Sequence, residues 1–547
     1  MATPLRIIPH GGLGEVGKNM TAFEYGRNIM LIDCGIMFPE NDMLGIDFII
    51  PDWQYLRDKS DWLRGIVVTH GHEDHTGGLP YLLKEFPDLP VFATKLTRGL
   101  IEVKLKNHKI METTRLNTIE AGGQLDLGPF SLEFFRVAHS IPDGVGVGIT
   151  TPAGLVVHTG DFKFDHTPVD GKPTDFAKLA EFGGRGVLAL MSDSTNADQP
   201  GTTPSERVVD AAFAQVFRDA KGRIIVGTFA SLISRIQQVA NAAMRNNRKM
   251  AIAGTSMVEN VKMAQKLGYL DIPSDLIVRL EDTKKMAPDR VVIMTTGTQG
   301  EPSSVLARAS VGAHPQIQVE RGDTIIMSSH PIPGNEEMVH RTINRLFQRG
   351  ANVLYDPIAQ VHVSGHASQE EQKLMLNLVR PEYFIPVHGE LRHLRAHERL
   401  AHQIGILPQN VFVVENGYPV EFHEGEARIG ERLPGGHVYI DGSGVGEIGP
   451  AVLRDREILG RDGFVVVTLR RDPERGLIID QPEITTRGFV YVQEAEELLT
   501  GAGEVVARVC GDSALSDRAV HDKVQEALAN YFYRETKRRP MIIPVLL

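Results

Sequence analysis

The stretch Thr69-His70-Gly71-His72-Glu73-Asp74-His75 comes directly after the apolar run Gly65-Ile66-Val67-Val68, which is typical of a buried strand that ends in a loop. Its imidazoles and carboxylates supply the nitrogen and oxygen ligands that zinc and manganese accept in proteins. In a tightly turned loop the first two histidines can hold one ion, while Asp74 and His75 turn toward a second. Without a metal, such a cluster would be costly to pack beneath a hydrophobic strand. The stretch therefore predicts a metal centre.

Three further residues, His139, Asp161 and His388, each stand at the end of a later apolar strand. Taken singly, such a histidine is more often packed or exposed than a ligand, but here the set shares one order and one context. The pattern resembles that of the metallo-β-lactamase fold. The resemblance implies that one ion is held by His70, His72 and His139, that a second is held by Asp74, His75 and His388, and that Asp161 bridges them.

Two metal ions in such a site lie about 3.5–4 Å apart and lower the pKa of a shared water toward neutrality, so that hydroxide can attack at physiological pH. The ions also neutralise charge on the oxygen of the group under attack. This chemistry suits esters, amides and phosphodiesters alike. The ligand pattern alone therefore predicts a hydrolase and leaves its substrate open.

The composition predicts a cytoplasmic enzyme with more than one domain. The chain has 547 residues, whereas single cores stop growing at roughly 250–300 residues. We find no apolar run of about eighteen residues and no signal-peptide core at the start. Cys34 and Cys510 are too few for a disulfide framework and are expected to be reduced core residues. The net charge of −11 argues against a nonspecific nucleic-acid coat, although basic patches can coexist with it.

An early glycine motif suggests a different function. Gly12–Gly17 reads GxGxxG after an apolar strand, and Asp33 follows at a distance typical of a dinucleotide site. Such a site needs a helix next, so that its amino terminus faces the pyrophosphate. Met20–Tyr25 and Ile29–Asp33 instead predict a β-hairpin. We therefore expect a tight loop near the metal centre, and Asp33 resembles the family's strand-end aspartate, which holds the metal loop by hydrogen bonds.

The residues between Asp161 and His388 exceed what a minimal metallo-β-lactamase domain needs and predict an inserted domain. Thr203–Glu206 has the pattern of a capping box, with threonine as the cap, proline first in the helix and glutamate closing the box. Short apolar runs then alternate with helical stretches, which predicts a parallel sheet flanked by helices. The runs are Arg223–Val226, Lys249–Ala253, Arg290–Thr295, Thr324–Ser328 and Asn352–Tyr355.

Ligands bind such sheets at the carboxyl ends of the strands, where this sequence gathers small and polar residues. Gly227–Ser231 ends one strand before a helix that begins near Leu232, which favours an anion site of free backbone N–H groups. An ordinary turn is the plainer interpretation. His362–Ser368 offers hydroxyls and two imidazoles where the chain returns to the metal domain. Met191–Asn196 ends the strand by which the chain leaves it.

These segments together resemble the β-CASP subfamily of metallo-β-lactamases, which acts on nucleic acids, and within it the bacterial ribonuclease J family. Asp193, His366 and His388 stand where the subfamily carries its motifs A, B and C, and Ile8–Asn19 adds to the likeness. The resemblance implies a 5′-to-3′ exoribonuclease with endonuclease activity, working in mRNA decay and rRNA maturation. Asp193 and His366 would be catalytic. The 5′-monophosphate of single-stranded RNA would be bound by Phe229, Ala230, Ser231, His362, Val363, Ser364, Gly365 and His366.

The last part of the chain predicts a separate small domain. Glu424–Gly436 is rich in glycine and charge and is typical of a linker. Phe464–Leu469 and Gly488–Val492 are typical of strands, and Val520–Tyr531 carries apolar residues at helical spacing. Aromatic and basic residues mix at 531–540, which fits RNA contact or, more plainly, a solvated helix end against a neighbouring subunit.

We therefore expect an α/β protein: a metallo-β-lactamase αββα sandwich with an inserted β-CASP parallel-sheet domain and a small α/β C-terminal domain. The resemblance further implies a homodimer or homotetramer formed through the last domain, a place in an RNA decay assembly, and a structural calcium near Asp47 and Asp441. No membrane association is expected. The expected boundaries are 1–203 and 367–423 for the metallo-β-lactamase domain, 204–366 for the insert, 424–448 for the linker and 449–547 for the C-terminal domain.

Two other functions remain open. One is a metallo-β-lactamase hydrolase that acts on a thioester or lactone, which the insert with Asp193 and His366 disfavours. The other is a non-catalytic RNA-binding or scaffold subunit, which has no physical need for a complete ligand set. The ligand types admit both zinc and manganese, and the balance of exonuclease and endonuclease activity cannot be read from spacing.

Overall fold

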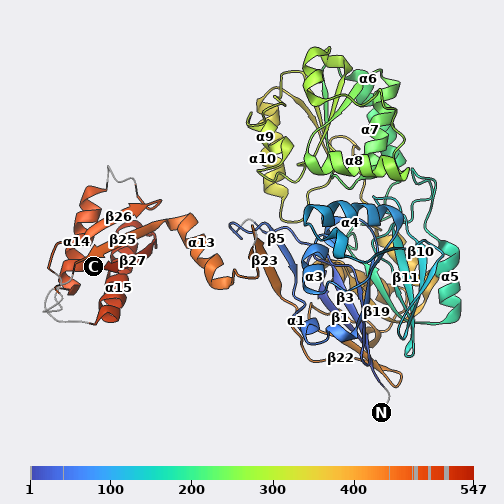
Figure 1. Cartoon of the computed structure of the whole chain (residues 1–547), viewed down its shortest axis with the longest axis horizontal. Helices are drawn as coiled ribbons and strands as arrows, with labels where there is room; N and C mark the ends of the chain where they lie inside the picture. The colour runs from blue at the N-terminus through green and yellow to red at the C-terminus, as the bar shows by residue number, and fades with distance from the viewer. Residues whose placement is uncertain are drawn as a thin grey trace. The chain divides into compact units, whose positions relative to one another are not determined.

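The computed structural model describes residues 3–40, 42–442, 444–470, 472, 479–490, 495–510 and 516–547. The chain divides into two units, coloured by residue number in Figure 1. The first comprises Met1–Phe38 and Phe48–Val438, and the second comprises Pro39–Asp47 and Tyr439–Leu547. Each unit has its own hydrophobic core.

Two facing sheets form the framework of the metal domain in the first unit. The eight-stranded sheet has the order β22 (Glu426–Ile429), β21 (Val420–His423), β1 (Leu5–Gly11), β3 (Met20–Tyr25), β4 (Asn28–Ile32), β6 (Leu63–Val68), β7 (Val91–Ala93) and β8 (Leu116–Thr118). The six-stranded sheet has the order β19 (Pro381–Val387), β13 (Val187–Asp193), β12 (Gly154–His158), β11 (Val145–Thr151), β10 (Phe130–Arg136) and β9 (Gln124–Leu127). Strand β22 thus lies within the stretch expected to be a linker.

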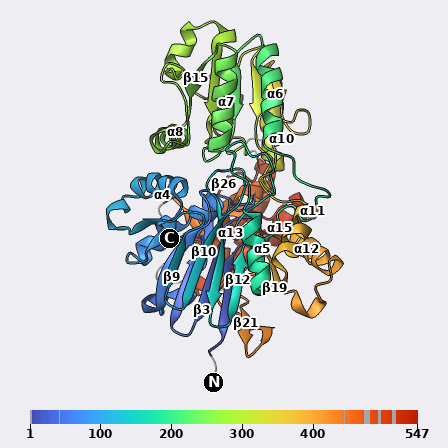
Figure 2. The same cartoon turned by 90° about the vertical axis from the view of Figure 1, so that its right-hand side faces the viewer.

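The two sheets share one core and carry helices on their outer faces. Phe23 of β3 and Val67 of β6 pack in the same cluster as Val147 of β11 and Ile385 of β19. The outer face of the six-stranded sheet packs on three helices, and another helix lies against β7 and β8 (Figure 2). These helices are α5 (Phe176–Arg185), α11 (Gln369–Val379), α12 (Leu391–Gln403) and, on the other side, α4 (Lys95–Asn107). The αββα sandwich expected from the sequence is confirmed.

Strands β12, β13 and β19 position the functional residues because they run parallel to one another. Their side chains are apolar on both faces, as strands covered on both sides require: Leu190 and Phe384 face the outer helices, whereas Ala189 and Ile385 face the central core. Parallel strands have their carboxyl ends at the same edge of a sheet. The segments that follow these three strands therefore begin side by side.

The insert is a second α/β layer built on a parallel sheet, as predicted. Its strand order is β15 (Lys249–Ile252), β16 (Val291–Thr295), β14 (Ile224–Gly227), β17 (Thr324–Met327) and β18 (Asn352–Leu354). One face packs on α6 (Arg207–Asp219), α7 (Ile233–Arg245) and α8 (Thr255–Leu267), and the other packs on α9 (Val305–Ser310) and α10 (Glu336–Gln348). Figure 1 shows α9 and α10 on the opposite side of this sheet from α6 and α7.

The predicted capping box at Thr203–Glu206 is wrong. Helix α6 begins only at Arg207, and the Thr203 hydroxyl donates to the carbonyl of His366 at 2.6 Å. The carboxylate of Glu206 pairs with Arg235 at 2.7 Å and does not reach back to a cap. Both side chains bind partners that are distant in the sequence. A local sequence pattern cannot reveal such partners.

The GxGxxG motif lies in a loop that leads to a hairpin, as predicted. Strands β3 and β4 pair antiparallel. Gly12 has a φ of 88°, and a Cβ there would lie 2.2 Å from Asn19 Oδ1, so the position needs glycine. Strand β2 (Leu13–Gly14) pairs with β20 (Gly389–Glu390), directly after His388. No helix follows the glycines, which excludes the dinucleotide site.

The second unit contains a three-stranded sheet with two helices. Strand β25 (Phe464–Leu469) lies between β26 (Glu483–Arg487) and β27 (Met541–Leu546). Helices α14 (Glu496–Cys510) and α15 (Asp517–Thr536) bury their apolar residues against this sheet. Among the described residues of the chain, no helix has the length and apolar character needed to span a membrane.

One strand prediction in this unit is wrong. The strand next to β25 ends at Arg487, before the predicted Gly488–Val492, and residues 488–490 form a bend. Gly488 has a φ of 72°, and a Cβ on Gly463 would lie 2.4 Å from the Gly488 carbonyl carbon. The backbones of these two glycines thus approach closely at the point where the strand ends. Residues 491 and 492 lie outside the described residues.

Candidate metal centre and active site

All seven predicted metal ligands lie at one edge of the sandwich. Four of them follow the end of a strand: His70 follows β6, His139 follows β10, Asp161 follows β12 and His388 follows β19. The short helix α2 (Glu73–Thr76) then turns Asp74 and His75 toward the same point. Residues that stand at the ends of separate strands in the sequence thus lie together in the structure.

The donor atoms form two groups that share one aspartate. Within each group the ligand atoms lie within 4.8 Å of one another. His72 Nδ1 lies 3.0 Å from His70 Nε2 and 3.1 Å from His139 Nε2. The first group is His70, His72, His139 and Asp161, and the second is Asp74, His75, His388 and Asp161.

Asp161 lies between the two groups. Its Oδ2 is 3.2 Å from His75 Nε2 and 3.6 Å from both His70 Nε2 and His388 Nε2. This oxygen is buried, and among the described residues no hydrogen-bond donor is assigned to it. A buried carboxylate oxygen that faces several imidazole nitrogens without a bond is costly unless a cation satisfies it. The cluster therefore fits divalent metal, with Asp161 placed between the two donor groups.

The protonation states of His70, His139 and Asp161 agree with this fit, whereas burial lowers the pKa of His75 and His388 but the neighbouring Asp161 raises it overall. Burial lowers the pKa of His70 and His139 well below its usual value, and neighbouring histidines lower it further. Both rings are therefore neutral, which is the form that binds a metal. Burial alone would raise the pKa of Asp161, but His388 and His75 hold it well below its usual range. Asp161 is accordingly an anion.

Hydrogen bonds behind the cluster orient the imidazoles. Asp33 Oδ2 accepts from His75 Nδ1 at 2.7 Å, and Asp33 also accepts from the backbone N–H and hydroxyl of Thr69. The Gly365 carbonyl accepts from His139 Nδ1 at 2.7 Å. Such partners set the tautomer and turn the other ring nitrogen toward the cluster.

Sequence reasoning missed one of these partners. The Thr195 hydroxyl accepts from His388 Nδ1 at 2.5 Å and donates to Asp193 Oδ1 at 2.8 Å. It therefore joins a predicted ligand to a predicted catalytic residue. Its place two residues after a strand-end aspartate was visible in the sequence, but its partner lies 193 residues away.

Asp193 and His366 lie beside the cluster. His366 Nδ1 donates to Asp193 Oδ2 at 2.8 Å, and both residues form a third group of close donors with Asp161 and His388. The His366 side chain is 19% exposed, whereas that of Asp193 is 1% exposed. Burial lowers the pKa of His366, but Asp193 raises it above its usual value overall. His366 therefore holds its proton more readily than a free histidine does, at the exposed side of the cluster.

The predicted anion loop lines a cleft that also reaches the metal loop. The cleft has a volume of about 360 Å³. Phe229, Ala230 and Ser231 line it from the insert, and Gly71 and Glu73 line it from the metal domain. The loop His362–His366 makes other contacts, including the hydrogen bond of Gly365 to His139 and that of Ser364 Oγ with Asn196.

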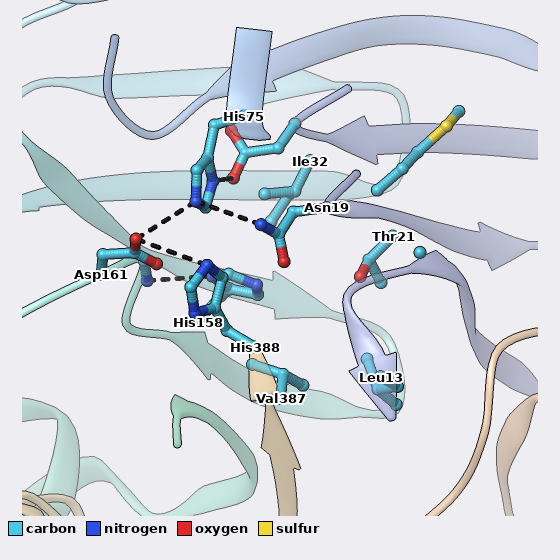
Figure 3. A pocket seen from close by; sticks show the side chains of 13 residues that line it. Leu13, Asn19, Thr21, Ile32, His75, His158, Asp161, Val387 and His388 are labelled. Carbon is cyan, nitrogen blue, oxygen red and sulfur yellow. Dashed lines mark hydrogen bonds and ion pairs between the residues drawn. The ribbon is translucent and has the colours of Figure 1, made fainter. Parts of the chain in front are cut away.

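A small cavity of about 20 Å³ adjoins the cluster on its inner side (Figure 3). Asn19, His75, His158, Asp161 and His388 are among its lining residues. A space of this size holds about one water molecule. It is too small for a nucleotide.

The two residues of the predicted calcium site have protein partners. Asp441 Oδ2 pairs with Arg456 at 2.5 Å, and Asp47 Oδ2 accepts from the backbone N–H of Gly442 at 2.7 Å. The calcium site stays a prediction.

Comparison with known proteins covers the whole chain. Residues 221–346 match the family described as "Ribonuclease J, beta-CASP domain", and residues 451–547 match "Ribonuclease J C-terminal domain". Residues 27–212 match "Beta-lactamase superfamily domain", and residues 350–414 match "Zn-dependent metallo-hydrolase RNA specificity domain". Ribonuclease J2 of Bacillus subtilis is 43% identical over 99% of this chain and 98% of its own length. The chain belongs to the ribonuclease J family.

Other ribonuclease J proteins are similarly close. Ribonuclease J 1 of Streptococcus pyogenes is 42% identical over 98% of this chain and 96% of its own length. Ribonuclease J of Corynebacterium glutamicum is 40% identical over 100% of this chain and 76% of its own length. A solved protein of unknown function from Enterococcus faecalis, 13% identical, covers 77% of this chain and all of its own, with a TM-score of 0.53, and shares the fold. Membership of the ribonuclease J family confirms the prediction of a hydrolase of the nuclease class that binds divalent metal. It disfavours the two alternative functions, a thioester or lactone hydrolase and a non-catalytic scaffold.

Proposed function

We propose that this ribonuclease J family member is a metal-dependent ribonuclease that degrades RNA from its 5′ end. It prefers a 5′-monophosphate and also cleaves internally, and it serves mRNA decay and rRNA maturation in the cytoplasm. The observation that carries this proposal is the cleft that joins the metal loop at Gly71 to the anion loop Phe229–Ser231. One end of a single strand can be held there while a nearby phosphodiester lies over the histidine cluster.

The seven residues of the two donor groups would hold two divalent ions, zinc or manganese. Ions bound there would supply Lewis-acid activation of water and charge neutralisation at the scissile phosphodiester. The chain's own contribution is to fix the ligands. Asp33 and the Gly365 carbonyl orient His75 and His139, and Thr195 orients His388.

His366 is proposed to protonate the leaving 3′-oxygen. Its Nδ1 is committed to Asp193, which leaves Nε2 for the substrate. The raised pKa keeps a share of the ring protonated near neutral pH, as a general acid requires. Asp193 holds the ring in place and stabilises its charged form.

The loop Phe229–Ser231 is proposed to bind the 5′-phosphate. It precedes α7, whose amino-terminal dipole favours an anion. The N–H groups of Ile233 and Arg235 themselves donate to carbonyls of the preceding turn. Phe229 is half-buried in the cleft wall, where its ring can stack on a base. The loop His362–His366 would complete the pocket from the second crossover. A pocket fixed at a set distance from the metal centre determines where the chain is cut, so that each cut releases a mononucleotide. A 5′-triphosphate is too large and too charged for this pocket.

Self-association belongs to the second unit in this proposal. Its three-stranded sheet ends in the edge strands β26 and β27, and Ile543 on β27 is 39% exposed. An edge strand with apolar side chains can pair with that of another copy. Sedimentation should show a dimer or tetramer, and a strictly monomeric protein would refute this part.

One experiment tests the nuclease proposal. A single RNA is labelled at its 5′ end, prepared as monophosphate and as triphosphate, and incubated with the protein and manganese, with EDTA as the control. We expect rapid release of labelled mononucleotide from the monophosphate form alone, and none with EDTA. Internal fragments from both forms would show an endonuclease without the 5′ pocket. No metal-dependent cleavage of either form would refute the proposed function.

A further inference from the structure

A cluster of buried charges lies where the chain passes between the metal domain and the insert. Lys163 and Arg235 are both fully buried, and Glu206 is 4% exposed. Such side chains are rarely buried unless they are paired. None of the three belongs to the donor groups at the metal centre. Their burial therefore needs a separate explanation.

The ammonium group of Lys163 bonds to both crossovers, which are the two segments that join the metal domain to the insert. Its Nζ donates to the carbonyl of Pro204 on the outgoing crossover and to the carbonyl of Ser364 on the returning one, each at 3.2 Å. Asp165 Oδ2 and Glu206 Oε1 each lie 3.8 Å from the same nitrogen. One cation thus bridges segments 160 residues apart (364 − 204) and is balanced by two carboxylates.

The insert contributes the second cation of the cluster. Arg235 on α7 pairs with Glu206 Oε2 at 2.7 Å and donates to the Val361 carbonyl at 2.8 Å. The Ser328 hydroxyl donates to the same carbonyl at 2.6 Å. Glu206 therefore lies between the two cations, with one oxygen toward each.

The loop between these anchors touches the metal centre. The Gly365 carbonyl accepts from His139 Nδ1, and a Cβ on Gly365 would lie 2.6 Å from that ring. His366, the next residue, is bonded to Asp193. The backbone N–H of Lys163 donates to the carbonyl of Ala138, the neighbour of His139, at 2.8 Å. Lys163 is therefore tied both to the segment that carries His139 and to the loop that orients it.

We propose that Lys163 is a positioning residue, whose ammonium holds the Pro204 and Ser364 carbonyls and so sets the place of the loop Val361–His366 against the metal ligands. Glu206 and Arg235 keep this cation buried and fix the far end of the loop. Lys163 does not touch substrate; it acts through His366 and the Gly365 carbonyl. This inference rests on the proposed cleavage of RNA at the cluster.

The test compares Lys163→Met with a matched control, Lys178→Met. Lys178 lies on α5 and forms its ion pairs with Glu133 and Glu181, neither of which belongs to the buried charge cluster of Lys163. For each protein one measures hydrogen exchange of the amides in residues 361–366, bound manganese, and kcat and KM on a 5′-monophosphorylated RNA. We expect Lys163→Met to exchange faster in this loop, to keep its metal and to lose roughly 10- to 100-fold in kcat/KM through a raised KM and a lowered kcat. The control should match the wild type.

A second variant separates the positioning role of Lys163 from a simple loss of folding. Lys163→Met leaves Asp165 without a cation and Glu206 with Arg235 alone, whereas Lys163→Met/Glu206→Gln removes one charge of each sign. We expect the double variant to melt at a higher temperature than the single one, yet to keep the raised KM. A fall in kcat alone, in proportion to the folded fraction, would show a merely structural lysine and overturn the inference. So would unchanged loop exchange.

The exchange measurement separates this inference from the proposed function. If the wild type fails to cleave RNA, the nuclease proposal fails. Faster loop exchange in Lys163→Met, with the control unchanged, would then still support the positioning role, and equal exchange would refute it.

Discussion

Asp193 Oδ2 and His366 Nδ1 are joined by a hydrogen bond of 2.8 Å across 173 residues of sequence. Asp193 ends the strand that leaves the metal domain, and His366 lies on the crossover that returns to it. The bond places one partially exposed imidazole beside Asp161 and His388, where the two donor groups meet. This pair is the basis of the first two predictions.

Replacing His366 by alanine should lower kcat on RNA by about 10²- to 10⁴-fold, because the leaving oxygen loses its proton donor. RNA affinity and metal content should change little. Single-turnover cleavage, filter binding and metal analysis measure the three quantities. His340→Ala, on an exposed position of α10, is the matched control. Full turnover combined with weakened binding would show that His366 holds the substrate and donates no proton.

Asp193→Asn should lower kcat by on the order of 10²-fold, because the amide cannot hold His366 in its charged form. The double variant Asp193→Asn/His366→Ala should be about as slow as His366→Ala alone, since groups that act as a unit are not additive. Rates of the two single variants and the double variant give the coupling. Additive losses would mean that Asp193 acts independently of His366, for instance through Thr195.

Asp33→Ala should weaken metal binding by about 10- to 100-fold. The substitution removes the acceptor of His75 Nδ1 and of the Thr69 N–H, so the ring and the metal loop lose their orientation. Titration with a competing chelator measures the affinity. Asp170→Ala, at an exposed loop position, should leave it unchanged. Equal affinities in the two variants would contradict the orienting role.

Stability should fall between pH 6.5 and pH 5 in part because of His397. This ring is fully buried, its centroid lies 4.7 Å from that of Phe384, and burial lowers its pKa to about 3. The folded pKa is below the unfolded one, so the unfolded chain binds the proton first and gains stability as pH falls. The loss is about 2 kcal/mol over these 1.5 units, at about 1.4 kcal/mol per unit.

The comparison that isolates this effect is His397→Gln, which cannot titrate. Urea unfolding of the wild type and the variant at both pH values gives the difference in slope, and losses from other histidines cancel in it. The variant should lose about 2 kcal/mol less than the wild type over this range. Equal losses would show that His397 is not kept neutral in the folded protein.

Much of the architecture was predictable because its signals are local. The sequence 69–75 places several candidate ligands within one loop, directly after a strand that apolar residues identify. The alternation of short apolar runs and helical stretches likewise predicted the parallel sheet of the insert, and every predicted strand of that sheet is present with small changes at its ends. Both signals depend only on neighbours in the chain.

The helix-capping prediction was wrong, and other pairs were missed, because the side chains concerned have partners that are distant in the sequence. Thr203 and Glu206 have a helix-capping pattern, but the fold gives one to His366 and the other to Arg235. The burial of Lys163 and the bond of Thr195 to His388 left no local signal. Predicted ligands and unpredicted partners meet because the parallel strands β12, β13 and β19 bring their ends to one edge. Side-chain chemistry could be read from the sequence, whereas the pairing of buried charges required the tertiary structure, since each charge is stable only beside its partner.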